Sequence, residues 1–228
     1  RCPQNSSGSK EVGTLENKFV SNIEDSFNFW RHSPEEVIGA LTRFLSNGTL
    51  DRRAVLRAAT YLSLRSIPAL EDLCTLLGGG EDRVPAEPVI ILGILLSSGT
   101  NTQKAEVLWD FFDRDANGEV QKATLELLFG ALINASTALV AKSAKPNKEF
   151  SDNRLNKWRE DLRVRAPKAV SSLVETIIGS NSAITRQDFL AAVSSKDIQF
   201  GTTQIRSYVE KVIYVAFSAG SAFARFKR

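Results

Sequence analysis

The sequence predicts an all-α fold, and three observations carry that prediction. Most segments of the 228-residue chain place apolar residues at the three- and four-residue spacing of an amphipathic helix. Runs that alternate between apolar and polar residues, as half-buried strands do, are nearly absent. Short breaks rich in turn-forming residues separate the helical segments, at "SNGT", "GGGEDR", "DANGE" and "GSNSA".

Apolar periodicity and turn residues predict the bounds of the helices. The second helix has the clearest start, because Ser33 suits an N-cap and Pro34 suits a first turn. Examples of the predicted spans are 16–31, 34–45, 51–64, 67–77, 102–112, 122–141, 154–178, 186–195 and 203–218.

Composition narrows the class of protein. The chain is 43% hydrophobic and 24% charged, which is typical of a soluble globular protein. Its net charge of +3 is too small to indicate a nucleic-acid partner. Two cysteines, Cys2 and Cys74, do not make a disulfide framework and favour a reducing compartment. The longest apolar run, "VIILGILL", is too short to cross a bilayer, and no secretory signal is seen, so we expect a cytoplasmic protein.

Internal repeats organise the chain. The segments "SNGTLDRRAVLRAA" (46–59) and "SNSAITRQDFLAAV" (180–193) align in register, and "ANGEVQKATLELL" (116–128) fits the same frame. A fourth and poorer copy is "EDRVPAEPVIIL" (81–92). The branched residue of each copy falls 34, 36 and 64 residues after the previous one, so the last interval contains an insertion. These branched residues are Leu50, Val84, Val120 and Ile184.

The third copy contains "DRDANGEV", and there the chain resembles the EF-hand superfamily. Asp113, Asp115 and Asn117 match loop positions 1, 3 and 5 of D-x-[DN]-x-[DN]-G, and Gly118 matches position 6. Alternate side chains of a tight turn aim oxygens at one point, and glycine permits the sharp bend. Apolar helical faces flank the loop on both sides, as the resemblance requires.

Two interpretations of this loop stay open. In the first interpretation a calcium ion binds to the loop, and its ligands are Asp113, Asp115, Asn117, the carbonyl of Glu119 and Thr124. Position 12 of an EF-hand is a glutamate that gives two oxygens, whereas Thr124 cannot chelate in that way. The sequence therefore favours a structural relic over a useful calcium or magnesium site, with at most one weak site. The corresponding residues of the other copies are Ala54, Pro88 and Asp188.

The chain is similar to four-EF-hand proteins of the calcineurin B and neuronal-calcium-sensor type, with mostly degenerate loops. The resemblance implies two lobes of paired helix–loop–helix units whose apolar grooves hold an amphipathic partner helix. It divides the chain into a flexible segment (1–15), a first pair (16–100), a second pair (101–200) and a tail (201–228). The second pair would contain the insertion, 142–168.

The insertion and the tail are the remaining candidates for contact with a partner. The insertion holds nine basic and four acidic residues, a net +5, but a solvated linker followed by an amphipathic helix explains it better than a docking site. The tail carries a broad apolar stripe that would fold back into the second groove as an internal ligand or pack on a further domain. A membrane is the lesser option, because basic residues cluster only at its end. The stripe includes Ile205, Tyr208, Val209, Val212 and Phe217.

The sequence indicates no enzyme. His32 is the only histidine, so a serine or cysteine triad could use no other, and "FWRHSPEE" is typical of a helix end followed by a capped helix start. The segment "LLGGGEDR" lacks the pattern of a phosphate-binding loop. Our first hypothesis is a non-enzymatic regulatory or scaffold protein that binds a partner helix. The alternative is a regulatory EF-hand module of a larger protein whose catalytic or membrane domain lies beyond residue 228. A helical repeat without EF-hand loops is a third possibility, and it predicts no strands pairing Leu50 with Val84 or Val120 with Ile184.

Overall fold

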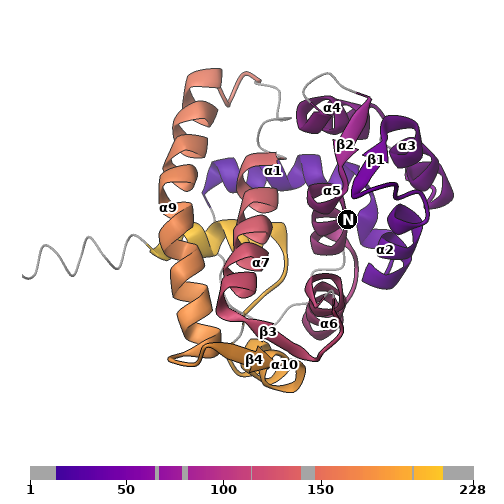
Figure 1. Ribbon diagram of the computed structural model, residues 1–228. Helices are drawn as coiled ribbons and strands as arrows, with labels where there is room; N and C mark the ends of the chain where they lie inside the picture. Colours follow the sequence, from indigo (N-terminus) through magenta and orange to yellow (C-terminus); the bar gives the residue numbers. More distant parts are fainter. Residues whose placement is uncertain are drawn as a thin grey trace, which may run out of the picture.

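The computed structural model describes most of the chain and confirms the all-α prediction (Figure 1). The described residues are 14–64, 67–78, 82–113, 115–139, 147–196 and 198–212. Nearly all regular structure is helical, and the strands are three residues long each.

Eight helices form four helix–strand–helix units. The first pair of units consists of α2 (Pro34–Thr42), β1 (Thr49–Asp51), α3 (Arg52–Tyr61), α4 (Ile67–Gly78), β2 (Arg83–Pro85) and α5 (Ala86–Leu96). The second pair consists of α6 (Asn101–Phe112), β3 (Glu119–Gln121), α7 (Lys122–Asn134), α9 (Asp152–Ile178), β4 (Ala183–Thr185) and α10 (Arg186–Ser195). The positively charged segment 152–168 is thus the first part of α9, which runs unbroken into the fourth unit.

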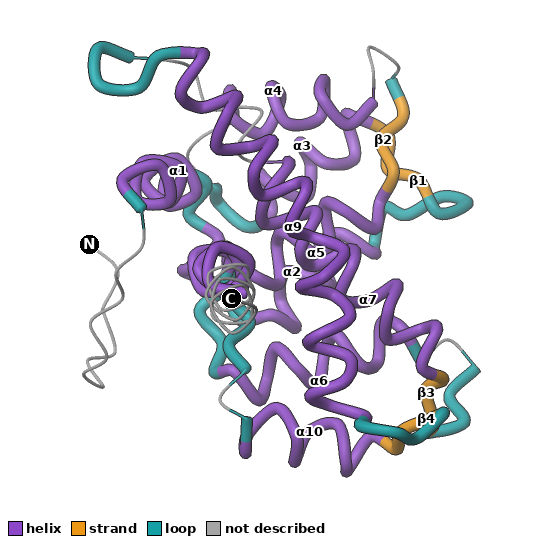
Figure 2. The backbone as a smooth tube through the Cα atoms, turned by 90° about the vertical axis from the view of Figure 1, so that its left-hand side faces the viewer, coloured by secondary structure: helices purple, strands orange, loops and turns teal. Residues whose placement is uncertain are grey.

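The strands join the units within each pair. β1 pairs with β2 and places Leu50 opposite Val84, and β3 pairs with β4 and places Val120 opposite Ile184, both antiparallel. The two small sheets lie at opposite ends of the molecule (Figures 1 and 2). This register is the one that the EF-hand interpretation requires, and it excludes a helical repeat without such loops.

Two helices outside the four units bring the ends of the described chain together. They are α1 (Leu15–Ser26) and the helical residues 202–212. Figure 2 looks almost along both helices, which lie side by side next to α9. Hydrogen bonds join them, among them the one from the amide of Asn17 to the hydroxyl of Ser207 at 3.0 Å.

The apolar core extends through both pairs of units. α5 is its centre, because every residue from Val89 to Leu95 is buried. The helix packs tightly against α2, since a Cβ on Gly93 would lie 2.6 Å from Cγ1 of Val37. Among the described residues, no helix is both long and apolar enough to cross a membrane.

Four helices end earlier than periodicity predicts, and the two largest differences have a local cause. The helix expected at 16–31 stops at Ser26, because Asn28 adopts a left-handed conformation (φ +62°) that an α-helix cannot continue through. A short 3₁₀ turn, η1 (Phe29–Arg31), follows. The helix expected at 122–141 gives way after Asn134 to a π-helical turn, η2 (Ala135–Leu139).

Candidate functional site

The loop after α6 is held by the carboxylate of Asp113. Its Oδ2 accepts hydrogen bonds from the backbone N–H of Gly118 at 3.1 Å and from the indole of Trp109 at 3.3 Å. The bond to Gly118 closes the loop over five residues, and the bond to Trp109 ties it to the preceding helix. The first position of the loop therefore has a structural role whether or not an ion binds.

The next two candidate ligands also bond within the loop. The side-chain amide of Asn117 donates to Oδ2 of Asp115 at 2.8 Å, and its oxygen accepts from the N–H of Glu119 at 2.8 Å. Gly118 has φ +76°, which glycine adopts freely, and Ala116 has φ +52°, which costs an alanine about 1 kcal/mol. The loop keeps the sharp bend that an EF-hand needs.

The residues fit a cation in part. Oδ1 of Asp113 is buried and has no hydrogen-bond partner in the part of the chain that the structure describes, so one ligand oxygen is free. Asp115, Asn117 and the carbonyl of Glu119 are the other donors of the predicted set. The bidentate carboxylate is missing, because half-buried Thr124 occupies its position near the start of α7. Within the described ranges, no three His, Cys, Asp or Glu side chains gather into a metal-binding group.

The first and fourth loops have other shapes. Between α2 and β1 the chain makes a tight turn, with Asn47 at φ +49° and Gly48 at φ +72°, closed by backbone bonds of 3.0 Å between Ser46 and Thr49. Before β4 the turn follows Gly179 (φ +60°) directly after α9. Turns this tight bring no row of acidic side chains to a common centre.

The second candidate site is the groove that residues 202–212 fill. Ile205 and Val209 are buried, and Tyr208 and Val212 pack against the core while partly exposed. The hydroxyl of Tyr208 donates to Oγ of Ser172 on α9 at 3.0 Å. Four of the five predicted contact residues thus lie in one interface; the fifth, Phe217, is outside the described residues.

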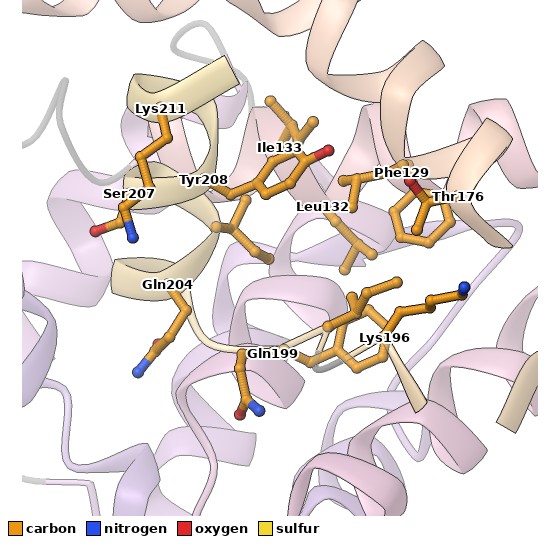
Figure 3. A pocket seen from close by; sticks show the side chains of 14 residues that line it. Phe129, Leu132, Ile133, Thr176, Lys196, Gln199, Gln204, Ser207, Tyr208 and Lys211 are labelled. Carbon is orange, nitrogen blue, oxygen red and sulfur yellow. The ribbon is translucent and has the colours of Figure 1, made fainter. Parts of the chain in front are cut away.

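A cavity of about 260 Å³ remains beside this helix (Figure 3). Its floor is apolar, and α7 contributes Phe129, Leu132 and Ile133, which face Tyr208. Lys196 and Lys211 lie on different sides of it, together with the side chains of two glutamines. The groove therefore has an apolar floor and a polar rim, as a binding site for an amphipathic helix has.

Sequence reasoning missed the polar side of this interface. The guanidinium of Arg206 is fully buried and makes a bidentate ion pair with Glu24 on α1, at 2.5 Å to Oε1 and 2.8 Å to Oε2. It also donates to Oδ1 of Asn17 at 2.6 Å and to the carbonyl of Ser136 in η2 at 3.0 Å. The sequence did contain a signal for this buried charge, because the charged residue Arg206 lies inside the apolar stripe that Ile205 and Val209 define.

A second polar cluster closes the groove at its outer end. The carboxylate of Glu210 accepts hydrogen bonds from the indole of Trp158 at 2.9 Å and from the hydroxyl of Thr14 at 2.7 Å. Arg165 donates to the backbone carbonyl of Glu210 at 3.1 Å. The positively charged part of α9 thus directs Trp158 inward, as an amphipathic helix does. Its Trp158 and Arg165 contact Glu210 within the protein.

Comparison with known proteins supports the EF-hand superfamily. The chain is similar to a recoverin family protein of Dictyostelium discoideum, with 29% identity over 185 residues, 76% of this chain and 80% of that protein. No protein-family model matches the chain. The similarity agrees with the pairing of four helix–strand–helix units and indicates an EF-hand type of regulatory protein.

Proposed function

We propose that this protein is a non-enzymatic, cytoplasmic regulatory or scaffold protein that binds an amphipathic partner helix in the groove of its second pair of units. One observation carries the proposal: residues 202–212, themselves an amphipathic helix, bury Ile205 and Val209 in that groove. A surface that accommodates one such helix from its own chain has the shape and polarity to accommodate another. The similarity to a recoverin family protein agrees with this role.

Calcium has at most a secondary part in the proposed function. The loop at Asp113 retains three side-chain oxygens and a backbone carbonyl, but Thr124 removes the residue that gives most to affinity. We therefore expect a partner helix to displace residues 202–212 from the groove without an ion. Calorimetric titration with millimolar calcium that gives neither heat nor a change in thermal midpoint would remove a sensor role.

Photo-cross-linking tests the partner-binding role. A benzoylphenylalanine at Lys196, on the rim of the cavity, should form adducts whose partner peptide, identified by mass spectrometry, is an amphipathic helix. The same group at exposed Leu127 is the matched control, since that side chain is not among those that line the cavity. Equal adducts from both positions, or partner peptides without helical periodicity, would contradict the proposal.

The alternative proposal is that these residues form a regulatory EF-hand module of a larger protein. In that case the groove would bind a helix of the same polypeptide. The length of the transcript distinguishes the two, because a long open reading frame after residue 228 favours the module and a stop codon near that point favours the separate subunit.

A further inference from the structure

We infer that a partner helix bound in this groove carries an arginine at the place of Arg206, with apolar residues one position before it and three positions after it. This inference rests on the proposed function, and it adds the chemistry by which the groove would select its partner. Residues 202–212 serve as the template, because they show which groups the groove offers to a helix.

The acceptor is a buried carboxylate. Glu24 is 3% exposed, and Arg206 meets both of its oxygens. The only other side chain that donates to this carboxylate among the described residues is Thr202, at 2.8 Å to Oε2. Thr202 belongs to the same helix as Arg206, so a partner that displaces this helix removes both donors and leaves Glu24 without either.

Three further acceptors point at the same place. Oδ1 of Asn17 and the carbonyl oxygen of Ser136 each receive one N–H of Arg206, and both residues are fully buried. The hydroxyl of Ser21 accepts another at 3.1 Å. Four acceptor groups from α1 and η2 thus surround one position. A neutral side chain there would leave a buried carboxylate uncompensated, which is strongly unfavourable.

A guanidinium suits this position better than an ammonium does. Arginine presents its N–H donors in a planar fork that meets a carboxylate at two points and still reaches Asn17 and Ser136. Lysine concentrates its three donors at one atom and cannot cover acceptors on several sides. The apolar positions follow from the same helix: Ile205 and Val209 are buried on either side of Arg206 along the chain.

Fluorescence anisotropy with labelled peptides tests this requirement. The receptor is the full chain with Arg206→Gln, which weakens the hold of its own helix on the groove. The probes are a synthetic peptide with the sequence of residues 198–212 and the same peptide with Arg206→Lys or Arg206→Gln. The unaltered peptide should bind about thirtyfold or more tightly than the glutamine peptide, with the lysine peptide between them. Adding Glu24→Gln to the receptor should remove most of this preference.

A second receptor variant keeps the test valid if the first variant does not fold. If circular dichroism shows that the Arg206→Gln chain is unfolded, the full chain with Val209→Ala takes its place, because it loosens the apolar contact and leaves Glu24 intact. The peptide order should be the same. In the unaltered full chain all three peptides should bind more weakly, since the native helix competes at high effective concentration.

The outcomes separate the inference from the proposed function. Equal binding of the arginine and glutamine peptides, or a preference that survives Glu24→Gln, overturns the arginine requirement and leaves helix binding in place. If no peptide binds either receptor, the groove accepts no helix from another molecule and the proposed function fails with the inference. If light scattering shows that the full chain is a dimer and that truncation before residue 202 makes it monomeric, the occupant is a second copy and a separate partner is excluded.

Discussion

The ammonium group of Lys104 donates a 2.7 Å hydrogen bond to the carbonyl oxygen of Leu95. Lys104 lies in α6 and Leu95 in the last turn of α5, so the bond connects the two pairs of units. A cation at the carbonyl end of a helix is favourable. The side chain is only 8% exposed, however, and burial lowers the pKa of Lys104 to about 8.

Stability should rise with pH because of Lys104. Between pH 8 and 10.5 this lysine is protonated in the unfolded chain and neutral in the folded one, so unfolding takes up a proton and becomes less favourable as pH increases. The free energy of unfolding of the wild type should gain about 3 kcal/mol relative to Lys104→Met across this interval. Urea unfolding of both proteins at three pH values measures the difference, and a constant difference would contradict the assignment. The thiol of Cys74 is present in both proteins, so its contribution to the pH dependence cancels in the difference between them.

The ion pair of Glu24 and Arg206 should show strong coupling. Glu24→Gln or Arg206→Met alone should lower the free energy of unfolding by about 3–5 kcal/mol, because each leaves a buried partner without its counter-charge. The double variant should cost clearly less than the sum. The control is Glu16→Gln, which breaks the ion pair with Arg154 and, with that arginine 43% exposed, should cost at most about 1 kcal/mol. Additive losses at 24 and 206 would disprove the coupling.

Restoring the twelfth loop residue should restore calcium binding. Thr124→Glu supplies a carboxylate at the position where EF-hands chelate with two oxygens, so calcium affinity should rise by about tenfold or more. Isothermal titration calorimetry measures this change. Ala123→Glu adds the same charge at the adjacent exposed residue and should have little effect. Equal gains in the two variants would mean that net charge, and not loop geometry, attracts the ion.

The thiol of Cys74 should resist modification in the native protein. Its side chain is 2% exposed, and burial, aided by Glu71 and opposed by Arg52, raises the pKa of Cys74 to about 11. In a Cys2→Ser background, Ellman's reagent at pH 8 should react slowly with the folded chain and at once in concentrated guanidinium chloride. Rapid reaction under native conditions would show that α4 opens readily.

Much of the fold was predictable, because it repeats. The alignment of the four copies placed Leu50 and Val84 in one pair and Val120 and Ile184 in the other, and the strands confirm both. Periodicity gave no bounds for α5, although the fourth repeat copy (81–92) covers its first half. Its run from Val89 to Leu95 is buried on all sides and therefore has no polar face to reveal a helical period.

The candidate sites were predictable only as far as local patterns extend. The spacing of Asp113, Asp115 and Asn117 is written in the chain, so the loop could be found from sequence. The partner of Arg206 could not be found in this way, because Glu24 lies 182 residues away and no local pattern in either segment indicates that the two are in contact. A charged residue within an apolar stripe indicates a buried pair, but only tertiary packing supplies its second member.

The side-by-side placement of α1 and residues 202–212 has a consequence for synthesis of the protein. A ribosome that adds roughly 5–20 residues per second needs on the order of ten seconds or more to pass from Glu24 to Arg206. Throughout that time α1 has been made but its counter-charge has not. The nascent chain can pair its sheets as each unit emerges, whereas Glu24 gains its counter-charge only among the last events of folding. A ribosome that stalls before residue 206 therefore leaves Glu24 without Arg206, and the first helix is then held only by its contacts with earlier residues such as Phe150.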